Sequence, residues 1–461
     1  MWRYFALRKI GVAALETFLL VCCGLIAYSF RPDKLSHNGF EYIYVLIKAT
    51  AIAIVFQFSL YLHDVHQFHG RQLSARFIGL LLRAVVVAVI VSYVVFFVLH
   101  GPADGYDVFA LNLILASLFV FFWHIGRCLY LRTRWPRTNL LVVGASNLAL
   151  AAVREILCQP ELGIRVVGFV AGTSKKAEAV SDVSAKIIGG YDDLQTLVSQ
   201  YDVNHIIVGL SDNRNKLPID TLLNFKARGM LIENVEDFYE RITGKIPAEN
   251  LRPSWLVFNS GFGISEDVFL QKRILSIILS VILLILTSPI LLLAAIAIKL
   301  DSKGPVFYKQ ERVGRNGRVF RLVKFRSMQH DAEKETGPVW STPGGDKRVT
   351  RIGRFLRRTR IDELPQIYNI LRGDMDMVGP RPERPVFVNK FSEEIPYYPI
   401  RHVVRPGVTG WAQVNYGYAN KLEHTIEKLQ YDLFYIKNIS LALDLMVIFE
   451  TVKTVLVRKG S

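Results

Sequence analysis

Long apolar segments fill most of the first quarter of the chain. Each of four runs is long enough, the last only just, to cross a hydrocarbon core of about 30 Å as a helix. These runs are Ile10–Phe30, Tyr42–Leu62, Phe77–Leu99 and Val108–Ile125. The first run lacks the small-residue cleavage site of a signal peptide, which favours a retained anchor. The pattern predicts a membrane bundle of four spanning helices over residues 1–137.

Basic residues predict how this bundle is oriented. Arginine and lysine gather before the first run, between the second and third, and after the fourth. Of the two loops on the opposite side, one carries only Arg31 and Lys34, and the other carries the acidic Asp104 and Asp107. Because cytoplasmic loops are enriched in Lys and Arg, both ends of the bundle are predicted to face the cytoplasm.

The pattern then changes to short apolar runs that alternate with helical segments. Such alternation is typical of an α/β domain with a parallel sheet, here predicted over residues 138–250. The expected strands are 140–143, 164–170 and 205–208, and the expected helices are 148–157 and 191–199.

The turn after the first of these strands argues against a dinucleotide site. Gly144 fits the fingerprint, but the next glycine position, where the backbone must approach a pyrophosphate, is Ser146. No acidic residue follows Val170 at the end of the second strand, where it would bind a ribose. We expect a Rossmann-like domain with a structural or regulatory role, with NAD binding as the weaker alternative. Residues 251–271 are expected to form the linker that follows.

A fifth apolar run, Ile274–Ile298, is interrupted near its middle by Ser288 and Pro289. Proline removes an amide donor and its ring clashes with the carbonyl four residues earlier, so a helix bends there. The two halves would be about 21 and 15 Å long, too short to cross the core singly. Basic residues flank both ends, at Lys272, Arg273, Lys299 and Lys303. We expect a re-entrant helix that returns to the cytoplasmic face; a kinked full span is the alternative.

Composition fits this mixture of membrane and soluble parts. Of 461 residues, 51% are hydrophobic and 21% charged, and the four cysteines form no CxxC pair or Cys/His cluster. The net charge of +16 is concentrated from Lys299 onward, where the chain has 29 Lys and Arg against 18 Asp and Glu. The densest stretch, Lys347–Arg360, interleaves arginines with Ile352, Phe355 and Leu356. It predicts a helix with its apolar side in the lipid headgroup layer. Nucleic-acid binding is disfavoured because no recognised nucleic-acid motif accompanies the charge.

Two motifs in this basic region carry candidate catalytic chemistry. Residues 324–328, Lys-Phe-Arg-Ser-Met, end a probable strand, so Lys324 and Arg326 point to one face and could clamp a diphosphate. Residues 362–366, Asp-Glu-Leu-Pro-Gln, are predicted to open a helix that ends at Gly373. The positive end of the helix dipole would keep the carboxylates of Asp362 and Glu363 ionised, and so available to a metal or a phosphorus atom.

Two proline-containing loops present further cations. Gly379-Pro380-Arg381-Pro382 displays Arg381, and Arg405-Pro406-Gly407 opens a second rigid loop that runs to Trp411. An acidic pair or a Gly-Pro turn has little specificity singly. Their order behind a broken hydrophobic helix is far more specific.

In that order the chain resembles the bacterial polyprenyl-phosphate sugar-1-phosphate transferases, monotopic phosphoglycosyl transferases in their large, four-span form. The resemblance implies a helical membrane bundle, a Rossmann-like middle domain, and an α+β catalytic domain over 272–461 with a re-entrant helix at 274–298. It also implies a UDP-sugar donor, undecaprenyl phosphate as acceptor and release of UMP. By this reaction the enzyme would start the synthesis of exopolysaccharide or O-antigen repeat units. The expected location is the bacterial inner membrane, in contact with its lipid, with the soluble domains on the cytoplasmic side.

The resemblance also assigns roles to residues. Asp362 is the implied nucleophile, assisted by Glu363, and the two carboxylates are the implied ligands of Mg²⁺. A carboxylate can attack the phosphorus next to the sugar and expel UMP, which is covalent catalysis. Lys324, Arg326, Arg381 and Arg405 are candidate substrate- and phosphate-binding residues.

Two other functions remain as alternatives. An NAD-dependent membrane-bound epimerase or dehydratase needs a Tyr-x-x-x-Lys pair, and the only such pair, Tyr44 and Lys48, lies inside an apolar run. A non-enzymatic scaffold for polysaccharide assembly leaves the ordered motifs unexplained. A homodimer is compatible with the sequence.

Overall fold

The chain folds into two compact units, Met1–Ile242 and Thr243–Ser461, described in turn. The residues that the computed structural model describes are 2–30, 39–65, 75–100, 106–134, 138–159, 162–171, 186–209, 218–248, 261–329, 348–416 and 422–457. The charged loop residues Arg31, Lys34, Arg71 and Asp104, on which the orientation of the bundle rests, lie outside these ranges.

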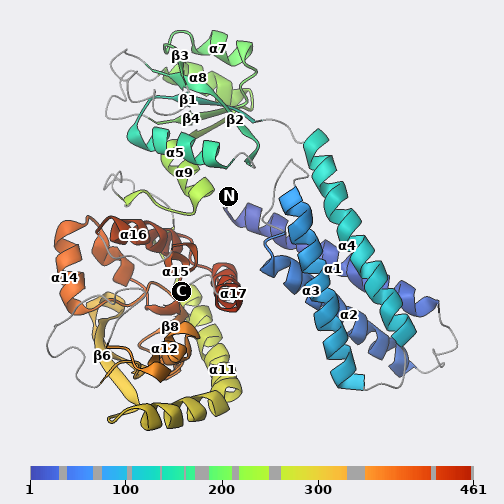
Figure 1. Ribbon diagram of the computed structural model, residues 1–461. Helices are drawn as coiled ribbons and strands as arrows, with labels where there is room; N and C mark the ends of the chain where they lie inside the picture. Colours follow the sequence, from blue (N-terminus) through green and yellow to red (C-terminus); the bar gives the residue numbers. More distant parts are fainter. Residues whose placement is uncertain are drawn as a thin grey trace. The chain divides into compact units, whose positions relative to one another are not determined.

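The first unit begins with four long apolar helices (Figure 1). All four are long and apolar enough to cross a membrane, by length and composition. Phe56, Leu81 and Phe109 pack in the core of the bundle, whereas Phe18 and Phe122 are exposed on its outside. The helices are α1 (Trp2–Ser29), α2 (Gly39–Leu62), α3 (Ala75–His100) and α4 (Tyr106–Arg134). They contain the four predicted runs apart from Phe30.

A buried carboxylate connects three helices of this bundle. Glu16 of α1 is 1% exposed. It accepts hydrogen bonds from Trp123 Nε1 of α4 at 2.6 Å and from Gln57 Nε2 of α2 at 3.3 Å. Arg127 NH1 lies 3.6 Å from the same carboxylate. Polar and charged partners of this kind stabilise a charge that is buried in an apolar bundle.

A five-stranded parallel sheet forms the rest of the first unit, in the order β3-β2-β1-β4-β5. Its strands are β1 (Thr138–Val143), β2 (Ile164–Val170), β3 (Ile187–Gly189), β4 (His205–Val208) and β5 (Leu231–Asn234). Its helices are α5 (Asn147–Cys158), α7 (Leu194–Gln200), α8 (Ile219–Ala227) and α9 (Val235–Thr243). The strands and helices predicted from the sequence are present, and β3, α8, β5 and α9 are additional.

Alternate residues of the central strand face opposite layers of helices. Leu140 and Val142 pack with α5 and α9, whereas Leu141 and Val143 pack with α7 and α8. This alternation follows from the two-residue period of a strand. The sheet is therefore covered on both faces, as parallel sheets require.

In the turn between β1 and α5, a side chain of the protein binds one of the amides at the start of the helix. Gly144 has a φ of +93°, a conformation that favours glycine. Ser146 is the N-cap of α5, and its hydroxyl accepts a hydrogen bond from the amide of Ala149 at 3.2 Å. Amides at a helix N-terminus are the groups that bind a pyrophosphate in dinucleotide domains. Here one of them already has a partner within the protein.

We therefore expect no tight binding of NAD⁺ or NADH. Isothermal titration calorimetry of the purified protein should give no heat of binding at micromolar ligand. Ser146→Gly should not create such binding, since the acidic ribose ligand is still lacking after Val170. A micromolar Kd for the natural protein would contradict the expectation.

The second unit combines one long helix with two small sheets and several short helices. Its first elements are α11 (Glu266–Asp301), β6 (Phe307–Val313), the 3₁₀ turn η6 (Arg315–Gly317) and β7 (Val319–Phe325). Next come α12 (Arg351–Arg358), η7 (Ile361–Glu363), α13 (Gln366–Arg372) and β8 (Asp376–Val378). The last are α14 (Pro385–Glu394), η8 (Tyr398–His402), β9 (Gly407–Thr409), α15 (Trp411–Asn415), α16 (Leu422–Lys437) and α17 (Leu441–Val457). Strands β6 and β7 are antiparallel, and β8 and β9 are parallel.

Helix α11 contains the predicted break and changes direction sharply along its length (Figure 1). Pro289 lies inside the helix and has no amide for the carbonyl of Ile285. The hydroxyl of Ser288 donates to that carbonyl at 2.9 Å. The expected bend is thus present, while α11 begins at Glu266, inside the predicted linker 251–271.

Only a narrow side of α11 is buried. Ser276 and Ser280 are covered before the break, and Ala294 and Ile298 after it. Ala294 and Ile298 pack in one cluster with residues of β7 and α12. Most of the large apolar residues of α11 remain exposed, and Leu300 reaches 83%. An apolar surface of this size needs a partner other than water.

The arginine-rich segment forms α12, but its apolar side does not face outward as predicted. Leu356 is buried, and Ile352 packs beside it against α11 and β7. Gly353 permits this packing, because an added Cβ would lie 2.0 Å from the carbonyl oxygen of Ser327. Of the three apolar residues only Phe355 is exposed, at 58%. The prediction erred because periodicity shows which residues share a face, and not what covers that face.

Candidate active site

A cavity of about 800 Å³ lies in the second unit, and charged side chains line much of it. Its walls come from β6, β7, η7, the loop after β8, α14, η8 and α16. Five of the predicted site residues line it together: Lys324, Arg326, Asp362, Glu363 and Arg381. The protein thus gathers motifs that are separated by up to 57 positions in the sequence.

The two carboxylates lie on the short 3₁₀ turn η7 that precedes α13. Arg360 starts this turn with a φ of +59°, an uncommon conformation for a residue other than glycine. Pro365 is the N-cap of α13, and the helix ends at Gly373 as predicted. The carboxylates are therefore just outside the helix, and not in its first turn as expected.

Glu363 is held by two cations. Its Oε1 accepts hydrogen bonds from Lys324 Nζ and from Arg381 NH2, each at 2.9 Å. Burial acts to raise the pKa of Glu363, but the charges of Lys324 and Arg381 outweigh burial and hold the pKa well below its usual range. Burial also lowers the pKa of Lys324, although the charge of Glu363 opposes this. Glu363 is accordingly ionised at neutral pH.

Asp362 has a different environment. It is 8% exposed, and its Oδ1 is buried without a hydrogen-bond partner among the described residues. Burial and the neighbouring charge of Glu363 raise the pKa of Asp362 to about 6, against the opposing charges of Lys324, Arg357 and Arg360. The expected effect of a helix dipole therefore does not dominate at Asp362. The side chain is still mostly ionised at neutral pH, which both a nucleophile and a metal ligand need. It is also shielded from solvent by its burial.

The guanidinium group of Arg326 binds the segment that directly follows α11. Its NH1 donates to the carbonyl of Lys303 at 2.9 Å, and its NH2 donates to the carbonyl and hydroxyl of Ser302 at 2.7 and 2.9 Å. The side chain is 5% exposed. Arg326 lies just after the end of β7, and of the two cations Lys324 contacts Glu363 whereas Arg326 does not. The contacts of Arg326 indicate an anchor for α11 more than a phosphate clamp.

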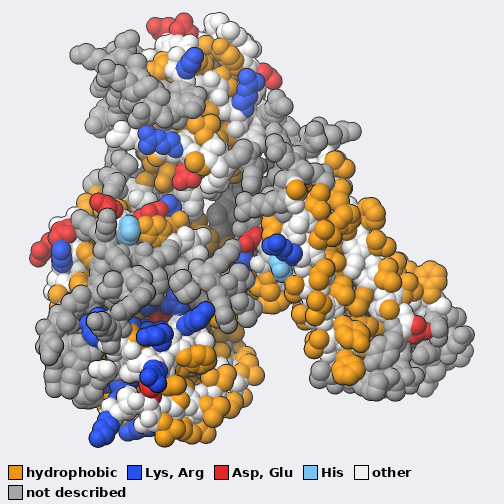
Figure 2. Space-filling view, in the orientation of Figure 1, with side chains coloured by type: hydrophobic (Ala, Val, Ile, Leu, Met, Phe, Trp, Pro, Cys, Tyr) orange, Lys and Arg blue, Asp and Glu red, His pale blue; other side chains and the backbone are white. Residues whose placement is uncertain are grey.

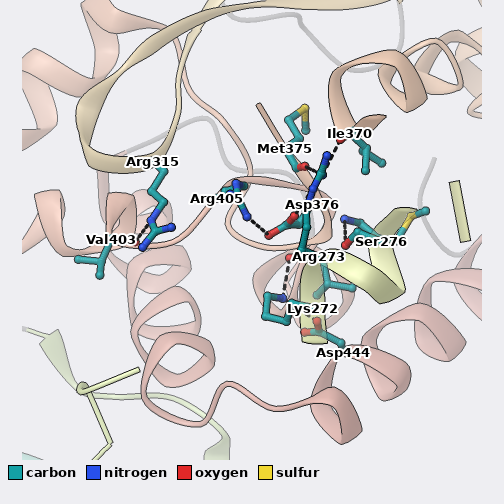
Figure 3. A network of polar contacts seen from close by, with 12 residues as sticks. Lys272, Arg273, Ser276, Arg315, Ile370, Met375, Asp376, Val403, Arg405 and Asp444 are labelled. Atoms are coloured by element: carbon teal, nitrogen blue, oxygen red, sulfur yellow. Dashed lines mark hydrogen bonds and ion pairs between the residues drawn. The ribbon is translucent and has the colours of Figure 1, made fainter. Parts of the chain in front are cut away.

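Arg405 lies in a separate network, shown in Figure 3. Its NH1 is 3.8 Å from Asp376 Oδ2, and Arg273 NH1 is 3.8 Å from the other oxygen. Asp376 is 1% exposed, at the start of β8. Arg405 is not among the residues that line the cavity. The charge of Arg405 compensates that of Asp376, so Arg405 is not part of the candidate donor site.

The same network explains the basic residues at the start of α11 (Figure 3). Lys272 is 1% exposed and donates to Asp444 Oδ2 at 2.6 Å and to Tyr435 OH at 2.5 Å. Arg273 NH1 donates to the carbonyl of Ile370 at 2.6 Å. Both cations therefore have partners inside the unit, and Lys272 is too deeply buried to act as an exposed flanking charge.

Comparison with known proteins decides the family. A family model described as bacterial sugar transferase matches residues 267–458, a range that includes all the residues lining the cavity. The UDP-glucose:undecaprenyl-phosphate glucose-1-phosphate transferase of Xanthomonas campestris is 34% identical over 337 residues, which cover 70% of this chain and 67% of that protein. The chain belongs to the bacterial sugar transferase family.

Other members of the family match a smaller part of the chain. The UDP-N-acetylgalactosamine-undecaprenyl-phosphate N-acetylgalactosaminephosphotransferase of Aeromonas hydrophila is 42% identical over 231 residues, 50% of this chain and 53% of that protein. The UDP-glucose:undecaprenyl-phosphate glucose-1-phosphate transferase of Caulobacter vibrioides is 44% identical over 192 residues, 41% of this chain and 71% of that protein. The matches thus span from about half to somewhat over two thirds of these relatives.

The sequence motifs missed several residues of this bacterial sugar transferase. Arg357 and Arg360 are close enough to lower the pKa of Asp362. Arg401 and Asp432 line the cavity as a buried ion pair, 2.8 Å between NH2 and Oδ2. The density of arginines around 351–360 was a signal for the first pair. The second pair had none, since the two residues are 31 positions apart and belong to no motif.

The carboxylates of the transferase fit a Mg²⁺ ion that is shared with a substrate. Among the described residues no group of three or more His, Cys, Asp or Glu side chains could hold a metal by itself. Mg²⁺ usually needs only one or two carboxylates when substrate phosphates and water supply the other ligands. The buried Oδ1 of Asp362, next to Glu363, has no hydrogen-bond partner in the part of the chain that the structure describes and is such a donor.

Proposed function

We propose that this protein transfers a sugar-1-phosphate from a UDP-sugar to undecaprenyl phosphate and releases UMP. The observation that carries the proposal is the buried carboxylate of Asp362, in a cavity lined by cations, with an oxygen that has no hydrogen-bond partner among the described residues. The names of the relatives support the two substrate classes. Such a transfer would begin the assembly of an exopolysaccharide or O-antigen repeat unit.

The proposed first step forms a covalent intermediate on Asp362. A carboxylate oxygen attacks the phosphorus next to the sugar, and the bond between this phosphorus and the oxygen bridging to UMP breaks. Lys324 and Arg381 would stabilise charge on the diphosphate, since they are already fixed beside Glu363. Asp362 and Glu363 would hold Mg²⁺, which when bound neutralises phosphate charge.

The proposed second step regenerates the carboxylate. An oxygen of the polyprenyl phosphate attacks the same phosphorus, and the bond to Asp362 breaks. Arg357 and Arg360 lie near Asp362 and supply positive charge for a second phosphate. The low exposure of Asp362 limits access of water, which would otherwise hydrolyse the intermediate.

The apolar surfaces support a proposal for the arrangement in the membrane. Figure 2 shows hydrophobic side chains gathered over α11, with lysine and arginine side chains beside them. We propose that α11 is re-entrant, that α1–α4 are four membrane spans, and that the Rossmann-like domain and the catalytic domain lie on the cytoplasmic side of the bacterial inner membrane. The exposed apolar face of α11 supports contact with lipid.

The function can be tested with membranes that contain the protein. Incubation with undecaprenyl phosphate, Mg²⁺ and a panel of UDP-sugars should release UMP with at least one donor and form the corresponding lipid-linked sugar. Membranes without the protein are the control. UMP release with no lipid-linked product would contradict transfer, and no release with any donor would contradict the reaction as a whole.

The re-entrant arrangement predicts that both ends of α11 are on one side. Single cysteines in place of the exposed Glu266 and Lys303, in a chain without its natural cysteines, should react with an impermeant thiol reagent only from the cytoplasmic side. Pro289→Leu should favour a straight, spanning helix and make the second site reactive from outside. Outside labelling at Lys303 in the chain with Pro289 would show a full span instead.

The structure gives little support to the epimerase or dehydratase alternative. Tyr44 and Lys48 lie on the apolar helix α2. In sequence they are about a hundred positions before the turn at Gly144 that would bind a dinucleotide. Ser146 already caps the helix at that turn.

A further inference from the structure

The loop that carries Arg381 is held in place by hydrogen bonds that its carbonyl groups accept from other segments. Four successive carbonyls, from residues 380 to 383, each accept a hydrogen bond from a different residue. The donors are Gly407 N at 3.0 Å, Arg401 NH2 at 3.0 Å, Arg312 NH1 at 3.0 Å and Val313 N at 2.9 Å. Two of the four residues in this stretch are prolines, which have no amide to donate. The loop therefore depends on these donors for its position.

Arg401 is the donor for Arg381 itself, and it is rigidly held. Its Nε and NH2 donate to Asp432 Oδ2 at 3.1 and 2.8 Å, and its NH1 donates to Tyr398 OH at 2.8 Å. Arg401 is 6% exposed and Asp432 is 2% exposed. Two N–H groups that donate to one charged carboxylate oxygen, together with a third that donates to a hydroxyl, fix the plane of the guanidinium group.

We propose that Arg401 is a positioning residue that acts on the reaction through Arg381. By holding the carbonyl of Arg381, it sets where the side chain of Arg381 meets Glu363, next to the nucleophile. The inference rests on the proposed function, because it concerns the same transfer reaction.

The contacts of Arg401 explain why it acts through another residue. Of its five N–H groups, four already donate to Asp432, Tyr398 and the carbonyl of Arg381. The guanidinium therefore has little capacity left for a substrate phosphate, although it lines the cavity. Arg381 differs, since its side chain is 36% exposed and its NH2 is bound to Glu363 at 2.9 Å.

A double-mutant cycle tests the inference. The measurement is the exchange of labelled UMP into UDP-glucose or UDP-N-acetylgalactosamine, whichever releases UMP, per amount of folded protein. Arg401→Gln should lower the exchange rate roughly 10- to 100-fold in the natural background, as for partners that orient a site residue. In an Arg381→Gln background it should lower the rate by less than about 3-fold, because the residue that it positions is already lost.

Two further variants make the cycle specific. Arg401→Lys should retain more activity than Arg401→Gln, since an ammonium group can still donate to the carbonyl or to Asp432. Arg273→Gln is the matched control, because Arg273 also donates to several carbonyls, but to none in this loop. Any loss caused by Arg273→Gln should be equal in both Arg381 backgrounds.

Equal losses for Arg401→Gln in both backgrounds would overturn the inference and leave the proposed function intact. If Arg401→Gln does not fold, Tyr398→Phe removes one contact of Arg401 and should give a smaller loss that also disappears in the Arg381→Gln background. A natural protein that uses neither donor nor any other UDP-sugar would overturn the proposed function, and this inference with it.

Discussion

Asp362→Asn should lower the rate of sugar-phosphate transfer by several orders of magnitude, the loss typical of a nucleophile that acts within a catalytic unit. The amide keeps the shape of the side chain but has no negative charge and almost no nucleophilicity. The natural protein should exchange labelled UMP into the UDP-sugar without any polyprenyl phosphate, because the covalent step needs only the donor. The variant should lose this exchange.

Asp374→Asn is a matched control for that experiment. Asp374 lies twelve positions later, contacts Arg372 and Asn369, and does not line the cavity. It should keep nearly natural exchange. If Asp362→Asn retained exchange, the covalent assignment would be wrong, and direct attack by the acceptor phosphate would be the better mechanism.

Glu363→Gln should lower turnover roughly 10²- to 10³-fold, because Lys324 and Arg381 would lose the charge that fixes them in the site. It should also move the acid limb of the pH–rate profile. In the natural protein the charge of Glu363 helps to raise the pKa of Asp362 to about 6. Without that charge the ionised form of Asp362 is favoured, its pKa falls, and activity should persist to lower pH than in the natural protein.

The pH–rate profile of kcat/KM for the two proteins measures this shift. Glu394→Gln, which alters an exposed ion pair on α14, should leave the acid limb where it is. An acid limb that stays in place or moves to higher pH in Glu363→Gln would show that ionisation of Asp362 does not control the reaction.

Much of the fold follows from periodic patterns in the sequence. The apolar runs predict helices α1–α4, and the strands β1, β2 and β4 match their predicted bounds closely. Ser288 and Pro289 predict the bend in α11 because the chemistry of proline is local. Strand β3 has only three residues, too few for a pattern to be distinguished from a loop. Strand β5 is as short as β4, but its second half is polar, Glu233 and Asn234, so it lacks the apolar run that revealed β4.

The candidate site was predictable only in part. Lys324, Asp362, Glu363 and Arg381 belong to dense local motifs, and the structure brings them together. Arg326 belongs to one of the same motifs, but its partners in the segment after α11 are more than twenty positions away. Spacing along a strand shows the direction of a side chain and not its partner. For Arg401 and Asp432 even the direction was unknown, because both are single charges in otherwise ordinary segments.

The hydrogen bond from the hydroxyl of Ser288 to the carbonyl of Ile285 determines which substitutions α11 can tolerate at its bend. If the bend lies in hydrocarbon, no water can take the place of the amide that proline lacks, and an unpaired carbonyl there would cost several kcal/mol. Ser288 donates to that carbonyl from the adjacent position, so the bend needs no second helix to support it. The serine and the proline therefore act together: replacement of the serine alone should be tolerated less well than loss of both.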